Sequence, residues 1–169
     1  IGIDAMGGDY GPSAVVEGVA LAAREMPGRF RITLVGDEAE IAPHIKRTPL
    51  GGTTVEIVHA PEKIDMAAKG AASARKTGSS LGVLTRLHKE GKVDAIFSAG
   101  NTGAMVATAL LTLGRMESVT RPALAAFFPS PAGGTVVLDV GANAECKAAY
   151  LVQFAHMGSV YARYLLGRT

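Results

Sequence analysis

The sequence predicts an α/β fold in which a doubly wound, mainly parallel sheet carries helices on both faces. Short β-rich segments alternate with helical segments along the 169 residues, and three expected strands run into glycine-rich turns. The 21 Gly and 28 Ala residues suit close packing of helices against a sheet. We expect a single α/β domain over residues 1–169. We also expect it to be incomplete, because the last element is a helix where an open sheet would continue into another strand.

The first sixty residues predict three strands and two helices. The expected strands are 1–4, 31–35 and 54–59, and the expected helices are 13–26 and 38–44. The segment from Ser13 to Met26 places apolar side chains near helical spacing, and Pro27 and Gly28 end it. The strand at 54–59 is rich in β-branched residues.

The rest of the chain predicts three more strands and three longer helices. Residues 60–78 are rich in Ala and basic residues and predict a partly helical segment. Ser79 and Ser80 can cap a helix that runs to Glu90 and that Gly91 ends. The other expected elements are strands at 93–98, 123–128 and 135–139 and helices at 104–113 and 147–166.

The composition argues against several classes of protein. Apolar residues make up 48% and charged residues 19%, which argues against disorder. Trp is absent and aromatic residues are 5%, so we expect no nucleic-acid partner. The longest strongly apolar run, 104–113, is far shorter than the ~20 residues that span a bilayer. The first residues show no basic segment of a signal peptide, and the single cysteine, Cys146, fits the reduced cytoplasm.

The sequence shows no motif for a cofactor or a metal, and we expect neither. The glycine fingerprint of dinucleotide sites and the P-loop are both missing. The histidines lack metal-ligand spacing, and we expect structural or surface roles for His44, His59, His88 and His156. Cys146 precedes a helix, where a thiolate would be stabilised. No His neighbours it in the sequence, so an inert thiol is the favoured interpretation.

Positive charge is concentrated between Lys63 and Lys92. This stretch holds seven Lys or Arg against Asp65 and Glu90, a surplus of five, whereas the whole chain carries +2. The simpler interpretation is a solvated helix face. The alternative is a surface that binds an anionic partner.

Three turns predict a cradle for phosphate. They are Asp4-Ala5-Met6-Gly7-Gly8-Asp9, Ser98-Ala99-Gly100-Asn101-Thr102-Gly103 and Asp139-Val140-Gly141-Ala142-Asn143. Each follows an expected strand, so in a parallel sheet all three would lie at the carboxyl edge, where ligands bind. Glycines let the backbone approach a ligand, and helix N-termini offer free N–H groups. Lys147, at the start of the last helix, could add a cation. Glycine turns also occur in α/β proteins for structural reasons alone.

The three turns, together with Arg-Pro-Ala at 121–123 and Leu-Val-Gln-Phe-Ala-His-Met-Gly-Ser-Val-Tyr at 151–161, resemble the phosphate acyltransferase (PlsX) family of bacteria. The resemblance is collinear and covers essentially the whole chain. Glu145 stands where the family usually has Asp, Ala148 where it often has Pro, and residues 65–78 match loosely. Family members continue for about as long again. The resemblance implies that this further half holds other site residues, much of a dimer interface and a membrane-associating segment.

The resemblance implies an acyltransferase that moves a fatty acyl group from acyl carrier protein to inorganic phosphate, giving acyl phosphate for phospholipid synthesis. It implies a Rossmann-like fold similar to those of phosphotransacetylases and isopropylmalate dehydrogenases. It also implies a homodimer in the cytoplasm that associates peripherally with the membrane. The carrier protein is strongly acidic, so the basic stretch becomes a candidate docking face. The expected contacts are Lys69, Arg75, Lys76 and Arg86.

We expect phosphate to attack the thioester directly, without a covalent enzyme intermediate. The expected catalytic residues are Asn101, Asp139 and Asn143. The expected substrate- and phosphate-binding residues are Asp4, Gly7, Gly8, Asp9, Ser98, Gly100, Thr102, Gly103 and Lys147. Two alternatives stay open: a phosphotransacetylase-like enzyme that uses acyl-CoA, and a non-catalytic fragment that binds carrier protein or phosphate. A β-decarboxylating dehydrogenase fits less well, because neither carboxylates for a divalent metal nor a nicotinamide site is evident.

Overall fold

A computed structural model describes residues 1–68, 70–131, 133–143 and 145–167. The chain divides into two compact units, Ile1–Gly114 and Arg115–Thr169. The two units are described separately below. The expectation of a single domain over residues 1–169 stays a prediction.

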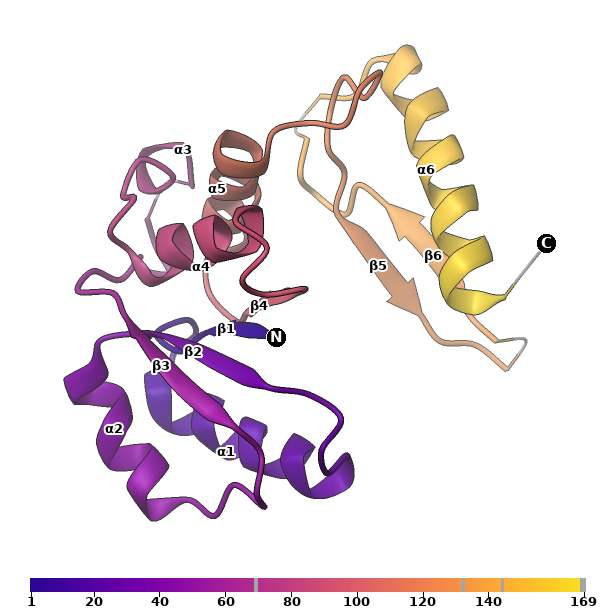
Figure 1. The fold of residues 1–169 in the computed structure, drawn as a ribbon. Helices are drawn as coiled ribbons and strands as arrows, with labels where there is room; N and C mark the ends of the chain where they lie inside the picture. The colour runs from indigo at the N-terminus through magenta and orange to yellow at the C-terminus, as the bar shows by residue number, and fades with distance from the viewer. Residues whose placement is uncertain (69, 132, 144, 168–169) are drawn as a thin grey trace. The chain divides into compact units, whose positions relative to one another are not determined.

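The first unit is built on a four-stranded parallel sheet with the strand order β3-β2-β1-β4 (Figure 1). Its strands are β1 (Gly2–Asp4), β2 (Ile32–Gly36), β3 (Val55–His59) and β4 (Ile96–Ser98). Each strand pairs in parallel with its neighbours. The predicted α/β fold with a mainly parallel sheet is therefore confirmed.

Helices lie on both faces of this sheet. They are α1 (Gly11–Glu25), α2 (Glu38–Arg47), α3 (Gly70–Ser73), α4 (Ser80–Lys89) and α5 (Thr102–Leu113). Figure 1 shows α1 and α2 on one side of the strands and α3, α4 and α5 on the other. The prediction of helices on both faces is thus confirmed.

The alternation of side chains in β2 explains why the unit has two apolar cores. Ile32 and Leu34 belong to a core with residues of α1 and α2, whereas Val35 belongs to a second core with residues of α4 and α5. All five residues of β2 are buried. A parallel strand that is covered on both faces reads as a continuous apolar run, because neither set of alternating side chains meets water.

The element boundaries differ from the predicted ones by a few residues. Helix α1 begins at Gly11 rather than Ser13, because Pro12 is accepted in the first turn of a helix. Helix α2 continues through Pro43 to Arg47 rather than ending at His44. Strand β4 is limited to Ile96–Ser98. In the segment predicted to be partly helical, the described helix is the short α3.

The second unit contains an antiparallel strand pair and the longest helix. Its elements are β5 (Ala125–Phe128), β6 (Thr135–Leu138) and α6 (Ala148–Leu166). The two strands and the helix were predicted, but their expected place in the parallel sheet is wrong: Ala125 pairs with Leu138 in antiparallel register. Residues 129–134 are too few for the crossover of a dozen or more residues that parallel strands need. Among the described residues, no helix is long and apolar enough to cross a membrane.

Candidate functional site

The first and second glycine turns meet at the carboxyl edge of the parallel sheet. β1 pairs with β4 so that Asp4 lies opposite Ser98. The buried Asp4 carboxylate accepts hydrogen bonds from the Ser98 hydroxyl (2.8 Å) and from the Met6 N–H (3.1 Å). The Ser98 hydroxyl in turn accepts a hydrogen bond from the Gly100 N–H (3.0 Å). Two segments far apart in the sequence are therefore joined by one chain of hydrogen bonds, as the shared sheet edge predicted.

The approach of these turns is close enough to require glycine. A Cβ on Gly7 would lie 2.8 Å from Asp4 Oδ2 and 2.8 Å from the Gly100 nitrogen. A Cβ on Gly100 would lie 3.1 Å from the Ser98 hydroxyl oxygen. Gly8, with φ of 87°, adopts a backbone conformation that side chains disfavour. The turns thus form a tightly packed backbone surface, which is what a cradle for a small anion needs.

Asn101 links the second turn to a distant segment. Its side-chain oxygen caps α5 by accepting the Ala104 N–H (2.8 Å). Its amide nitrogen donates to the carbonyls of Met66 (2.7 Å) and Ala68 (2.9 Å). Both donors of the amide are therefore engaged. A direct bond from this side chain to phosphate would require at least one of them to open.

The N-terminus of α5 presents backbone donors beside the two turns. Thr102 and Gly103 are its first residues, and both are exposed. The first amides of a helix have no acceptor within the helix, and the dipole favours an anion there. Asp9 is also exposed, at the far end of the first turn. The structure thus brings Asp4, Gly7, Ser98 and Gly100 into contact and places the remaining residues of both turns around them.

The third turn has its own hydrogen-bond network in the second unit. Asp139, which has φ of 63°, accepts hydrogen bonds from the Asn143 amide (2.9 Å) and the Cys146 thiol (3.1 Å). Asn143 also donates to the Pro122 carbonyl (3.2 Å). This turn follows an antiparallel strand, so the premise that it ends a strand of the parallel sheet is wrong. Lys147 precedes α6, is exposed, and makes no side-chain capping bond.

The network around Asp139 changes the acidity of two groups. Desolvation acts to raise the pKa of Asp139, but the hydrogen bonds from Cys146, Asn143 and the backbone outweigh it, so this pKa is lowered. The pKa of Cys146 is raised, mainly because its thiol donates to the Asp139 carboxylate. The carboxylate opposes the thiolate that the start of a helix would favour. The geometry thus supports an unreactive thiol at Cys146.

The link between Asp139 and Cys146 can be tested by alkylation. We expect the Asp139→Asn variant to react with iodoacetamide at Cys146 several-fold faster near neutral pH, because losing the negative charge lowers the thiol pKa. Asn accepts the positive φ at this position. The rate is measured against pH by mass spectrometry. Glu145→Gln removes a neighbouring charge and should leave the rate unchanged; equal rates in wild type and Asp139→Asn would contradict the assignment.

The predicted basic face lies partly along a cavity between α4 and α5. The cavity has a volume of about 530 Å³, and its lining includes Ala74, Thr77, Arg86 and Lys89. Arg75 and Lys76 lie between Ala74 and Thr77 in the sequence. Arg75, Lys76 and Arg86 are exposed, whereas Lys69 lies outside the described residues.

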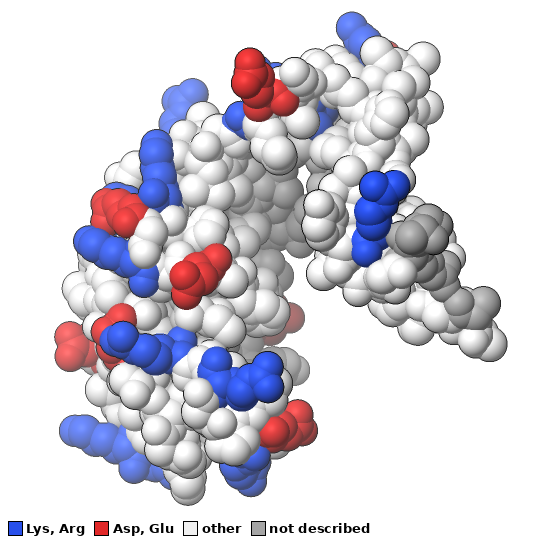
Figure 2. All heavy atoms as spheres, turned by 45° about the vertical axis from the view of Figure 1, so that its right-hand side comes forward, with Lys and Arg blue, Asp and Glu red and all other residues white. Residues whose placement is uncertain are grey.

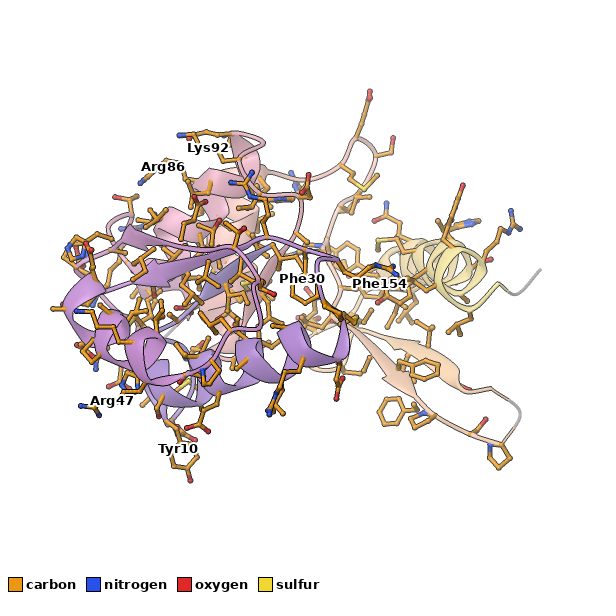
Figure 3. The ribbon with its side chains drawn as sticks, turned by 60° about the horizontal axis from the view of Figure 1, so that its bottom comes forward. Tyr10, Phe30, Arg47, Arg86, Lys92 and Phe154 are labelled. Carbon is orange, nitrogen blue, oxygen red and sulfur yellow. The ribbon has the colours of Figure 1, made fainter. Side chains whose placement is uncertain are left out.

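An exposed ion pair within the basic stretch neutralises part of its positive charge. Lys92 pairs with Glu90 at 2.8 Å, and the hydrogen bond and charge of Lys92, with a contribution from Arg86, lower the pKa of Glu90. Figure 3 shows Arg86 and Lys92 at the same end of the molecule. In the view of Figure 2, basic and acidic side chains are interspersed rather than gathered in a patch of one sign.

A groove beside the two turns was not anticipated from the sequence. It has a volume of about 640 Å³ and lies along α1. Gly7, Gly8 and Ala99 line it, as do Phe97 of β4 and Gly18 of α1. The sequence does show small residues at helical spacing along α1, namely Gly11, Ala14, Gly18 and Ala22. The sequence does not show which strand lies beside this helix, so the groove could not be predicted from them. Among the described residues, no three His, Cys, Asp or Glu side chains gather in a way that could hold a metal ion.

Known proteins are similar to this chain over its whole length. A family model described as "Fatty acid synthesis protein" matches residues 1–169. The chain is 46% identical over 170 residues to a phosphate acyltransferase of Pelotomaculum thermopropionicum. This match covers 100% of this chain and 49% of that protein. It is 42% identical to a phosphate acyltransferase of Aquifex aeolicus and 44% identical to one of Synechocystis, with 99% of this chain covered in both cases. The chain spans about half the length of these relatives.

Proposed function

Because the chain belongs to the fatty acid synthesis protein family, alongside relatives named phosphate acyltransferase, we propose that the complete protein transfers a fatty acyl group from acyl carrier protein to inorganic phosphate. The product is an acyl phosphate, which serves phospholipid synthesis. The observation that carries the proposal is the joining of the two glycine turns through Asp4, Ser98 and Gly100 next to the N-terminus of α5. Oriented amides beside a helix N-terminus are suited to phosphate.

In this proposal the enzyme acts mainly by positioning. Phosphate is held by the N–H groups of residues 101–103 and by Thr102, because the Gly100 N–H already donates to the Ser98 hydroxyl. One of its oxygens attacks the thioester carbonyl carbon, the C–S bond breaks, and the carrier protein leaves as the free thiol. Alignment of two bound reactants can supply a large part of the acceleration. Asn143 is proposed to donate to the developing oxyanion. This role requires its amide to open the hydrogen bond to the Pro122 carbonyl while the bond to Asp139 is kept.

The aspartates have separate roles in the proposal. Asp4 orients the first turn through the Met6 amide and the second through Ser98, which its hydrogen bonds support. Asp139 orients Asn143 in the same way. Asp9 makes no hydrogen bond that would occupy its carboxylate among the described residues, and it is the group proposed to take a proton from phosphate.

The acidic carrier protein is proposed to dock on the face formed by Lys69, Arg75, Lys76 and Arg86. We expect Lys76→Glu/Arg86→Glu in the complete protein to raise the KM for acyl carrier protein about tenfold at low salt, with kcat little changed, because complementary charge speeds the encounter. The difference should shrink as salt increases, since exposed charges are screened. Lys46→Glu/Arg47→Glu on α2, on the other side of the sheet (Figure 3), is the matched double charge reversal. Equal KM values for the two variants would reject this face.

We also propose that the complete protein is a cytoplasmic homodimer that associates peripherally with the membrane. The support is the resemblance to the family, whose further half is implied to hold the dimer interface and the membrane-associating segment. The measurements are the molar mass of the complete protein in solution and its co-sedimentation with phospholipid vesicles. A monomer, or a protein that stays in the supernatant, would reject the corresponding part of the proposal.

The reaction itself is tested by phosphate-dependent release of free thiol from a long-chain acyl carrier protein. The assay is run on this chain and on a complete protein of the relatives' length. Release by the complete protein alone supports the reaction and shows that residues 1–169 are not sufficient for it. A preference for acyl-CoA would favour the phosphotransacetylase-like alternative. No release by either protein, with the complete one folded, would favour a binding module.

A further inference from the structure

We propose that the groove along α1 holds the hydrocarbon chain of the acyl group, so that the chain-length preference of the enzyme is set within residues 1–99. This inference rests on the proposed acyltransferase function, and it names the part of the substrate that the groove takes. The groove has a volume of about 640 Å³, within the usual range for a small-molecule site.

The first argument is that the groove begins at the proposed phosphate site. Gly7, Gly8 and Ala99, which line one end, belong to the two turns joined through Asp4 and Ser98. An acyl phosphate has its phosphate and its hydrocarbon chain on either side of a single carbonyl carbon. A polar cradle that opens directly into an apolar groove therefore matches the two ends of the product.

The second argument is the chemistry of the walls. Ile3 and Phe97 line the groove from the sheet, and Val15 and Val19 line it from α1. Ile1 and Met26, which flank these elements, line it as well. Phe97 is 57% exposed and Met26 is 46% exposed, so apolar surface here lacks cover within the first unit. Asp9 is the charged side chain in the lining, and it belongs to the first turn rather than to the far end. Such walls suit a hydrocarbon chain and would disfavour a polar group.

The third argument is the space left by small residues on α1. Gly11, Ala14, Gly18 and Ala22 all line the groove. A Cβ on Gly18 would meet nothing within 4 Å, so this glycine is not required for packing inside the protein. A glycine in the middle of a helix is otherwise unfavourable. A bound hydrocarbon chain that fills this space would explain why position 18 has no side chain.

The dimensions suit a long acyl chain. Helix α1 has 15 residues, which corresponds to about 22 Å along its axis. Tyr10 directly precedes α1 and Phe30 follows it, so these two lining residues lie toward opposite ends of the groove (Figure 3). A long-chain fatty acyl group in extended form has a length of this order.

The test uses two variants at different depths in the complete protein. Gly18→Leu blocks the groove near its middle, and Ala22→Leu blocks it one helical turn further from the turns. Leu is a good helix former, so both variants should fold. Glu17→Leu is the matched control, because it adds the same side chain to an exposed position of α1 that does not line the groove.

The first readout is turnover against acyl-chain length, from butyryl to stearoyl carrier protein. We expect Gly18→Leu to lose long-chain activity by about tenfold or more while short-chain activity changes little, because a misplaced reactant is costly. Ala22→Leu should retain activity on chains of intermediate length, and Glu17→Leu should match wild type. An unchanged length profile in Gly18→Leu, with turnover intact, would overturn the groove assignment without touching the proposed reaction.

The second readout does not depend on turnover. The affinity of n-alkyl phosphonates, from butyl to hexadecyl, is measured by calorimetry. In wild type we expect a gain of about fourfold for each methylene that enters the groove. In Gly18→Leu the gain should stop at a shorter chain. If wild type shows no phosphate-dependent turnover, the proposed function fails, and this series still decides the groove: a gain cut short by Gly18→Leu supports it, and affinities independent of chain length overturn it.

Discussion

Replacing Gly7 by Ala is expected to lower the phosphate-dependent activity of the complete protein by about a hundredfold. The added Cβ would lie 2.8 Å from both the Asp4 carboxylate and the Gly100 nitrogen, and 3.0 Å from the Ser98 hydroxyl oxygen. These atoms form the link between the two turns, so relief of the clash must separate them. We expect a destabilisation of about 1–3 kcal/mol, as for other overpacked sites.

Gly18→Ala is the matched control for the stability part of this prediction. It adds the same methyl group to a glycine whose Cβ would meet open space, in a helix where Ala is favoured by about 1 kcal/mol. Urea unfolding is measured on both variants, and steady-state kinetics compare Gly7→Ala with wild type. If Gly7→Ala is as active as wild type and as stable as Gly18→Ala, the two turns do not form a site that depends on their close approach.

Replacing Asn101 by Asp is expected to raise the KM for phosphate by about tenfold or more while the cap of α5 is retained. Asp is as good an N-cap as Asn, so the bond from the Ala104 N–H can persist. The two hydrogen bonds to the Met66 and Ala68 carbonyls are lost, which should cost about 1 kcal/mol each. The new carboxylate then faces two carbonyl oxygens and repels an anion at the N-terminus of α5.

Asn101→Ser separates these effects. Ser also caps a helix, but it removes the amide donors without adding charge. Hydrogen exchange reports the release of residues 66–68 in both variants, and phosphate KM reports the charge. If Asn101→Ser and Asn101→Asp have the same KM for phosphate, a charge at position 101 does not affect phosphate binding. The anion then does not lie near this turn.

Much of the fold could be predicted because its signals are local. The continuous apolar run of β2 and the small residues after each strand are visible without tertiary knowledge. The prediction that β5 and β6 lie in the parallel sheet is wrong, although the short connection at 129–134 indicates an antiparallel pair. The length of that connection excludes a crossover, whereas the β-rich composition of the strands says nothing about their direction.

The candidate site was predictable only in part for the same reason. Asp4 and Ser98 could be paired by assuming that both strands end at one sheet edge, and the structure bears this out. The hydrogen-bond partners of Asn101 could not be predicted, because Met66 and Ala68 lie in an irregular segment without a helical or strand pattern. The groove likewise depends on β4 lying beside β1, which leaves Phe97 and Gly18 facing one space.

The bond between Asp4 and Ser98 also has a consequence for the order of events during synthesis. Its partners are 94 residues apart, so at about 5–20 residues per second β1 leaves the ribosome roughly 5 to 20 seconds before the strand that completes its pairing. β2 can pair much sooner, which leaves the other edge of β1 open in the meantime. Open strand edges invite pairing with other chains. Pauses in translation between residues 60 and 95 should therefore favour aggregation of the nascent chain more than pauses after residue 98.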